Sequence, residues 1–504
     1  MPDTLLTIDI GLTNCKTVIF NSRGGLLARA SVPYATQRQH PGWVEQDPED
    51  WWRAILAGLA QLRETAPAAM SQIAAISVTG HMHALVCLGA DGTSLGPALV
   101  LGDQRSLKEA AEIADAIGLQ RIYELTGARM DASMPLAKIC WLRKHTPGIH
   151  STARAFLSCK DWVRHRLTGD VLTDPVDACG TSLYDIQRAS WAPELVAMAG
   201  IRPAQLPNVA DPCAIAGRLT QSAAALTDLQ AGTPVVVGAG DDVEVLGNSL
   251  LSAGTSLEHL GTTGSILTCA GQPIYDPEMA VELYPHTLAG LWVLGGSVTA
   301  AGSAMAWAEE ILRPWTPDGV KHPDQAWAPD LDSPLVFVPH LSGERCPTWE
   351  PHARGSWVGL SATHTTDHLR HAVLEGIVFS LKQVLERIEN LVGPQPRITV
   401  SGREEKDEQW LSLRATIYNR PLALLRTSEP TALGAMIVGA VGTGMYGTLS
   451  EAVEAATHIE RIIEPQPELA EQYEQLYTLY RESAETVGLV MRRWRKDVLN
   501  DRIA

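Results

Sequence analysis

Two turns that combine glycine with hydroxyl-bearing residues constrain the fold of this 504-residue chain most strongly. The first turn, residues 11–14 (GLTN), separates two strand-like apolar runs at 5–10 and 15–21. The second turn, residues 261–265 (GTTGS), also lies between apolar runs, about 250 residues further along. That separation is the length of one large domain. The pattern predicts a weak internal duplication, with one phosphate-binding loop in each half.

The remaining periodicity predicts a mixed α/β chain. Residues 51–62 carry apolar side chains at helical spacing, and residues 464–493 form a long helical pattern rich in Glu and Leu. Strands are expected at 73–78, 86–88 and 233–237, linkers at 315–329 and 394–396, and the length predicts two or three domains. Because hairpins and helices are mixed in the first half, a simple β-α-β series is not expected there.

The formal charge of the chain is 40 − 57 = −17, and the acidic residues are spread along the sequence. Such a field repels nucleic-acid backbones and anionic lipid, so neither is an expected partner. If a nucleotide is the substrate, its phosphates must be met by local backbone N–H groups and a divalent cation.

The eight cysteines occur singly, without a C-x-x-C pair or a zinc-finger spacing, and are interpreted as small buried apolar residues in a reducing compartment. The first residues lack the features of a signal peptide. The longest apolar tract, residues 432–441, is too short to span a bilayer. A cytoplasmic enzyme acting on a small molecule is therefore expected, with a homodimer as the ordinary oligomeric state.

Asp9 ends the first apolar run, directly before the turn that carries Thr13 and Asn14. A carboxylate beside a hydroxyl-bearing glycine turn suits Mg²⁺ and phosphate together. The alternative is a plain hairpin turn with a capping Asp. The sequence contains no Walker A motif, so a P-loop fold is not the explanation.

Two more strand ends carry polar residues. Asp241 and Asp242 follow an apolar strand and a glycine turn, where a carboxylate can serve as general base to a hydroxyl; the alternative is a solvated turn. Residues 79–83 (TGHMH) place His81 and His83 two positions apart. Since no third metal ligand is spaced nearby, hydrogen bonding to a polyol is the better functional interpretation, and a structural role for at least one histidine is the alternative.

The chain resembles the FGGY family of carbohydrate kinases over nearly its whole length. The matching segments are DIGLTN at 9–14, PGWVEQDPEDWW at 41–52, GHMH at 80–83, SMPLAKICWLRKH at 133–145, KDW at 160–162, RLTG at 166–169, PHLSGER at 339–345, GSWVGL at 355–360, HLRHAVLE at 368–375 and ALGA at 432–435. This resemblance implies an α/β chain of two actin-like (ribonuclease-H-like) ATPase domains with an interdomain cleft. Its N-terminal domain, at 1–238, would bind sugar and carry the first phosphate loop. Its C-terminal domain, at 239–504, would bind nucleotide, with the catalytic Asp at the junction.

Carried over position by position, the resemblance implies roles for individual residues. Asp241 would be the catalytic base and Asp9 the carboxylate that orients Mg²⁺. The residues expected to bind ATP are Thr13, Asn14, Lys16, Thr262, Thr263, Gly264, Gly302 and Gly402. The residues expected to bind the sugar are Met82, His83, Asp103, Arg105, Asp241 and Asp242.

Xylulose kinases of this family have a Met-His pair that touches the sugar, so Met82 and His83 imply a ketopentose-like substrate. Two differences from the family pattern are Asp242 and Glu244 after the base, which favour a neutral polyol or an amine, and Arg403-Glu404 in the expected adenine loop. D-Xylulose is the expected substrate, with another ketose or alditol (ribulose, erythritol, glycerol) as the alternative. A sugar-sensing pseudokinase and an actin-like or Hsp70-like protein are the two competing interpretations in which the chain phosphorylates no sugar.

Overall fold

The structure is a computed structural model that describes residues 4–313, 328–401 and 407–495. The chain forms two compact units. The first comprises Met1–Leu251, Leu283–Trp292 and Glu429–His458, and the second comprises Ser252–Glu282, Val293–Ser428 and Ile459–Ala504. The chain therefore returns to the first unit near its C-terminal end. The division into functional domains at 1–238 and 239–504 stays a prediction, and these compact units differ from it in including residues 239–251, 283–292 and 429–458 in the first unit.

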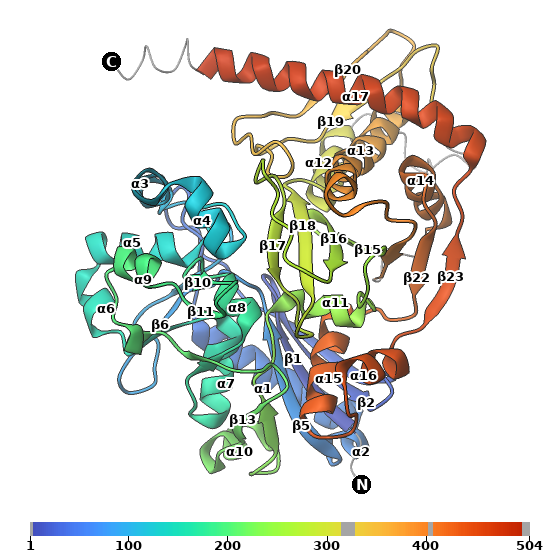
Figure 1. Cartoon of the computed structure of the whole chain (residues 1–504). Coiled ribbons are helices and arrows are strands. Elements are labelled where there is room, and N and C mark those ends of the chain that lie inside the picture. Colours follow the sequence, from blue (N-terminus) through green and yellow to red (C-terminus); the bar gives the residue numbers. More distant parts are fainter. Residues whose placement is uncertain (1–3, 314–327, 402–406, 496–504) are drawn as a thin grey trace. The chain divides into compact units, whose positions relative to one another are not determined.

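The first unit is built on a six-stranded sheet in the order β13-β14-β5-β1-β2-β3 (Figure 1). Its strands are β1 (Thr4–Ile10), β2 (Asn14–Asn21), β3 (Leu26–Pro33), β5 (Ile73–Gly80), β13 (Ile215–Arg218) and β14 (Pro234–Val236). Strand β1 pairs antiparallel with β2 and parallel with β5, while β14 pairs parallel with β5 and antiparallel with β13. The expected N-terminal meander, β1-β2-β3, is confirmed.

The strands of the second unit follow the order β18-β16-β15-β21-β22-β23. They are β15 (Ser256–Leu260), β16 (Gly264–Ala270), β18 (Trp292–Val298), β21 (Ile398–Val400), β22 (Leu422–Leu425) and β23 (Ile459–Ile463). Strand β15 pairs antiparallel with β16 and parallel with β21, and β22 pairs parallel with β21 and antiparallel with β23. This is the pairing pattern of the first sheet, so the duplication predicted from the two turns is confirmed.

Both units also contain helices. Those of the first unit include α1 (Pro48–Thr65), α3 (Leu107–Ile117), α4 (Leu119–Thr126), α5 (Pro135–His145), α7 (Cys159–Thr168), α8 (Pro175–Cys179), α9 (Pro193–Ala199), α10 (Gln221–Thr227), α11 (Glu244–Gly247), α15 (Pro430–Gly442) and α16 (Leu449–Ala456). Those of the second are α12 (Gly302–Leu312), α13 (Thr366–Val392), α14 (Glu408–Tyr418) and α17 (Pro467–Trp494). The helices predicted at 51–62 and 464–493 are thus confirmed as α1 and α17.

Helix α1 illustrates how the sequence specifies the first unit. Its N-cap residue, Asp47, accepts a hydrogen bond from the Glu49 amide, which satisfies one of the free N–H groups of the first turn. Trp51, Ile55 and Leu59 recur at helical spacing and are almost fully buried. This apolar face packs against β2 and β3.

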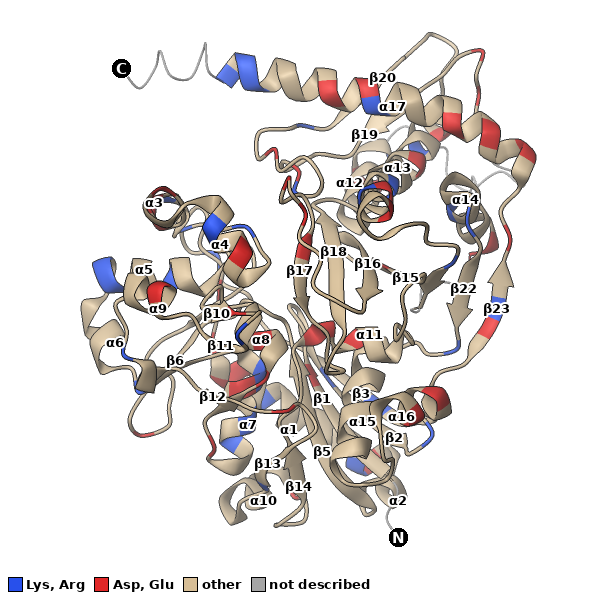
Figure 2. Cartoon of the chain, in the orientation of Figure 1, with Lys and Arg blue, Asp and Glu red and all other residues tan. Residues whose placement is uncertain are grey.

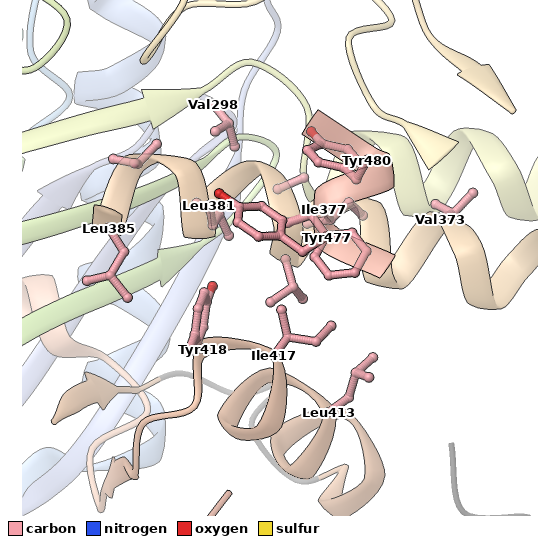
Figure 3. Packing of buried hydrophobic residues seen from close by; sticks show 14 of the residues in the cluster. Val298, Val373, Ile377, Leu381, Leu385, Leu413, Ile417, Tyr418, Tyr477 and Tyr480 are labelled. Atoms are coloured by element: carbon pink, nitrogen blue, oxygen red, sulfur yellow. The ribbon is translucent and has the colours of Figure 1, made fainter. Parts of the chain in front are cut away.

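The core of the second unit forms where α13, α14 and α17 meet (Figure 3). Phe379 on α13 lies 5.5 Å and 5.3 Å, centroid to centroid, from the rings of Tyr477 and Tyr480 on α17. Each buried aromatic ring of this kind contributes about 1.5–3 kcal/mol through removal of apolar surface from water. The last long helix is therefore part of the core of this unit.

Charges and cysteines follow the sequence expectations. Figure 2 shows Asp and Glu on elements of both units, without concentration on one segment. All eight cysteines are free, and seven of them are buried. No helix within the described residues is long and apolar enough to cross a membrane. The expected linker at 394–396 is a loop between α13 and β21, whereas most of 315–329 lies outside the described residues.

Candidate active site

The ends of β1 and β5 bring two of the predicted site segments together. In the parallel register, Asp9 lies opposite Thr79 and Ile10 lies opposite Gly80. The His81 amide donates to the Ile10 carbonyl at 2.9 Å, and Nδ1 of its ring lies 3.0 Å from the same oxygen. His81 is therefore structural, which is the role expected for at least one histidine of the pair.

Met82 and His83 lie beside the predicted base. The Met82 amide donates to Oδ1 of Asp241 at 3.2 Å, although the two residues are 159 positions apart. Nδ1 of His83 lies 2.8 Å from the Gly180 carbonyl, and the His83 backbone has a positive φ of 64°. A bulky residue in the left-handed region is uncommon and costs about 1–3 kcal/mol, which marks His83 as a residue held in place by its surroundings.

Lys138 binds the backbone of the segment that carries Met82 and His83. Its buried Nζ donates to the carbonyl oxygens of His83 (2.7 Å), Leu99 (3.3 Å) and Val100 (3.1 Å). Burial lowers the pKa of Lys138 to about 7, against the charges of Asp103 and Asp131, which raise it. The family-like run at 133–145 contains this residue, but nothing in its local pattern distinguishes it from a surface lysine.

The peptide that carries Asp241 runs through a narrow space. A Cβ added to Gly240 would lie 2.9 Å from Oδ1 of Asp177 and 2.9 Å from Cγ of Met82, so only glycine fits at this position without displacement. Burial raises the pKa of Asp241 well above the usual value, and the charges of Asp242, Glu244, Asp177 and Asp9 raise it further. A carboxylate of raised basicity is suited to accept a proton from a hydroxyl.

Asp9 lies opposite Lys16 across the β1-β2 pair. Nζ of Lys16 is 3.7 Å from Oδ2 of Asp9 and 2.9 Å from Oε2 of Glu429, which also pairs with Arg29. Burial is the main cause that raises the pKa of Asp9, and Lys16 opposes it. The charges of Glu429 and Glu244 add to the rise.

This donor set fits Mg²⁺ better than a metal held entirely by protein. Mg²⁺ is usually bound through one or two carboxylates, substrate phosphates and water. Asp9 is a buried carboxylate whose ionisation is disfavoured by acidic neighbours, so a nearby divalent cation would stabilise its charged form. No group of three or more His, Cys, Asp or Glu side chains in the described parts of the chain is arranged to hold a metal ion alone.

The carbonyl oxygens of the turn that carries Thr13 and Asn14 accept hydrogen bonds from other residues of the first unit. Tyr34 donates through its hydroxyl to Gly11 and, at 3.4 Å, to Asn14, and its amide donates to the Thr13 carbonyl. Nε2 of Gln46 donates to the Leu12 carbonyl at 2.7 Å. Because the carbonyl dipoles are engaged inside the protein, their repulsion of an approaching anion is reduced, which suits the phosphate-binding role predicted for this turn.

The second turn lies against the start of helix α12, in the second unit. The amides of Gly302 and Ser303 donate to the carbonyls of Gly261 and Thr262 at 2.9 Å and 3.1 Å. A Cβ on Gly302 would lie 2.5 Å from the Gly261 carbonyl oxygen, so this contact requires glycine. Thr262 and Thr263 are exposed, which leaves their hydroxyls accessible to a ligand. Gly264 begins β16 and is buried. The structure therefore brings Thr262, Thr263, Gly264 and Gly302 together.

One predicted nucleotide residue, Gly402, lies outside the described residues, as do Arg403 and Glu404 of the expected adenine loop. The predicted site residues otherwise divide between the units. The residues predicted to bind the sugar, to act as the base and to hold the metal belong to the first unit. Three residues predicted to bind ATP, Thr13, Asn14 and Lys16, also belong to the first unit, while residues 262–264 and 302 belong to the second.

Asp103 and Arg105, which are predicted to contact the sugar, pair with each other inside the first unit. Asp103 is fully buried and accepts the Val44 amide (2.7 Å) together with Nη2 of Arg105 (2.7 Å). Arg105, whose side chain is 3% exposed, also pairs with Glu45 (2.8 Å) and lies 3.7 Å from the ring centroid of Trp43. Both charges are thus compensated within the protein, and a direct contact of either residue with the sugar stays a prediction.

Two sheets of the same topology, each with a hydroxyl-bearing turn between its central antiparallel strands, place the chain among the actin-like ATPases. Comparison with protein families identifies the branch. Residues 4–246 match the N-terminal domain, and residues 250–443 the C-terminal domain, of the FGGY family of carbohydrate kinases. The chain belongs to this family and is a phosphotransferase.

Individual relatives agree with this assignment. The chain is 28% identical to the xylulose kinase of Bacillus subtilis, over 95% of this chain and 96% of the relative. It is 29% identical to the gluconokinase of the same organism, over 88% of each chain. The crystal structure of ligand-bound xylulose kinase from Lactobacillus acidophilus matches 97% of this chain and 99% of its own, with a TM-score of 0.90 and 27% identity.

Proposed function

We propose that this chain transfers the γ-phosphoryl group of ATP to a hydroxyl of a neutral sugar, with D-xylulose, converted to D-xylulose 5-phosphate, as the preferred substrate. The observation that carries this proposal is the hydrogen bond from the Met82 amide to Asp241. It joins the Met-His pair to the carboxylate whose raised pKa suits a general base. A hydroxyl bound at Met82 and His83 would therefore lie within reach of Asp241.

Charge favours a neutral sugar over an aldonic acid. Relatives of similar identity carry the names xylulose kinase and gluconokinase, so family membership leaves both substrate classes open. Asp242 and Glu244 follow the base directly, and both raise the pKa of Asp241 by their negative charge. A gluconate carboxylate bound beside these groups would experience the same repulsion, whereas a ketose would not.

Phosphoryl transfer needs positioning and charge neutralisation more than covalent chemistry. Asp241 would accept the proton of the attacking hydroxyl, while Thr13 and Asn14 in the first unit and Thr262 and Thr263 in the second would contact the phosphates of ATP. Mg²⁺ bound at Asp9 would neutralise part of the phosphate charge. Lys16 would offer its ammonium group to the same phosphates, exchanging one of its two carboxylate partners for phosphate oxygen.

A substrate panel tests this proposal. ADP release would be measured with D-xylulose, D-ribulose, erythritol, glycerol and gluconate at equal concentrations. We expect the highest kcat/KM with D-xylulose and the lowest with gluconate. A preference for gluconate would contradict the charge argument, and the absence of ADP release with every sugar would leave the pseudokinase as the better description.

Nucleotide binding separates the kinase from the pseudokinase and the actin-like or Hsp70-like protein. Calorimetric titration with ATP and Mg²⁺ is expected to show binding to a single site. If ATP does not bind, the chain is a sugar-binding protein without kinase activity. If ATP hydrolysis proceeds at the same rate with and without sugar, the actin-like or Hsp70-like interpretation gains support.

A further inference from the structure

A buried ionic cluster lies in the first unit behind the Asp241 loop. Nζ of Lys160, at the start of α7, lies 2.6 Å from Asp161, 3.1 Å from Asp174 and 3.4 Å from Asp177. Arg164, one turn further along α7, donates to Asp161 at 2.8 Å. All five side chains are 4% exposed or less. Five charged groups so far from water require close mutual compensation.

The cluster contacts the segment that leads to the base at two points. Nη1 of Arg164 donates to the Val237 carbonyl at 3.0 Å, directly after β14. Three residues later, Gly240 approaches Oδ1 of Asp177 so closely that a Cβ there would lie 2.9 Å away. Oδ2 of Asp177 is held by the Ser158 hydroxyl at 2.8 Å. The segment from Val237 to Gly240 is therefore supported by charged side chains along its buried side.

Asp177 itself is fixed from its own helix. Asp174 is the N-cap of α8 and accepts the amides of Val176 (2.9 Å) and Asp177 (3.3 Å). The same α8 turn ends at Gly180, whose carbonyl lies 2.8 Å from Nδ1 of His83. Helix α8 thus contacts Gly240, the residue before the predicted base, through Asp177. Through the carbonyl of Gly180 it contacts His83, a residue predicted to bind the sugar.

We propose that Asp177 is a positioning residue for Asp241, an inference that rests on the proposed kinase function. Its carboxyl group, held by Ser158 and Lys160, packs against Gly240 and fixes the peptide whose next residue is the base. The role is positional: Asp177 acts through Gly240 and does not contact the sugar. Misplacement of a catalytic group by about 1 Å can cost about 100-fold in rate, so this support is expected to affect kcat.

The charges of the cluster nearly compensate one another, which allows Asp177 to lie buried beside Gly240. Three carboxylates face two cations, which is one negative charge in excess. Burial raises the pKa of Asp177 to about 8, with Lys160 opposing the shift. An asparagine at this position would match the carboxyl group in shape.

Two substitutions separate positioning from general stability. In Asp177→Ala the support of Gly240 is lost while two carboxylates still balance two cations, so the protein is expected to fold. We expect kcat with D-xylulose to fall about 10- to 100-fold, with the sugar KM changed less than about threefold. Asp177→Asn keeps the shape of the side chain that packs against Gly240 and is expected to retain kcat within about threefold at pH 7.

A matched control uses another buried carboxylate of the first unit. Asp185, which is 5% exposed, accepts the amides of Gln187 and Arg188 at 3.0 Å each and pairs with the Arg188 side chain. Asp185→Ala is expected to lower stability without changing kcat. Hydrogen–deuterium exchange adds a readout that does not depend on activity: amides of residues 237–242 are expected to exchange faster in Asp177→Ala and to be unchanged in Asp185→Ala.

The outcomes separate this inference from the proposed function. An active wild type together with an Asp177→Ala variant of unchanged kcat overturns the positioning role. A loss of kcat that is equal in Asp177→Ala and Asp185→Ala also overturns it, because the effect would then be one of stability. If the wild type phosphorylates no sugar, the proposed function fails, and unchanged exchange at 237–242 in Asp177→Ala overturns the inference in that case.

Discussion

Gly240 offers the sharpest test of how the base is held. In Gly240→Ala the new methyl group would lie 2.9 Å from both the Asp177 carboxylate and the Met82 side chain. Carbon atoms in normal contact are separated by about 3.5–4.0 Å, so one neighbour or the peptide itself must move by at least about 0.6 Å. Because Asp177 is fixed by Ser158 and Lys160, the displacement is expected to fall on Met82 and on the Asp241 peptide.

Two magnitudes follow from this displacement. Overpacking of a buried site usually costs about 1–3 kcal/mol of unfolding free energy. A shift of this size at the base is expected to lower kcat about 10- to 100-fold. Steady-state ADP release would measure the second effect and urea unfolding the first.

Gly148, on a short helix of the first unit, is the matched control. No atom lies within 4 Å of a Cβ added there, and its φ is not in the positive range. Gly148→Ala is expected to change neither kcat nor stability by more than small amounts. If Gly240→Ala keeps the kcat of the wild type, the close support of the base by Asp177 and Met82 is refuted.

Two further predictions concern buried charges of the first unit. Arg105→Ala removes the partner of Asp103 and Glu45 and is expected to lower the unfolding free energy by about 3–5 kcal/mol while leaving the sugar KM nearly unchanged; a large rise in KM without loss of stability would restore Arg105 as a sugar contact. Burial lowers the pKa of Lys138 from 10.5 to about 7 in the folded protein. Between these pH values the unfolded chain binds one proton more than the folded chain, so the contribution of Lys138 to the unfolding free energy increases as pH rises. Urea unfolding at several pH values is expected to show this rise in the wild type relative to Lys138→Met, and identical pH slopes in the two proteins would contradict it.

The sequence predicted the parts of the fold that depend on local pattern. The GLTN and GTTGS turns between apolar runs indicated two equivalent hairpins, which the structure contains as β1-β2 and β15-β16. The return of Glu429–His458 to the first unit could not be predicted in this way, because the local sequence of an apolar helix does not show which sheet the helix packs against. Helix α15 packs on β1 and β5, two strands that lie far earlier in the sequence.

The site was predictable where chemistry lies at strand ends. Asp9, the Met82 segment and Asp241 each follow an apolar strand, and the sheet brings these strand ends together. Residues that act by long-range packing were missed: Tyr34 and Asp177 reach the site through side-chain contacts, without a motif of their own.

Asp103 and Arg105 are a case that the sequence leaves open. An Asp and an Arg two positions apart in a loop are consistent with either a sugar contact or an internal ion pair, and only burial distinguishes the two. The structure buries both side chains.

Asp241 is proposed to accept the proton of a sugar hydroxyl. The most direct measurement is kcat for ADP release by Asp241→Asn with D-xylulose, together with calorimetric binding of the sugar. Asparagine can still accept the Met82 amide but cannot take a proton, so kcat is expected to fall by a factor of about 10²–10⁴ while the sugar Kd changes less than about threefold. Turnover near that of the wild type would contradict the assignment of Asp241 as the base.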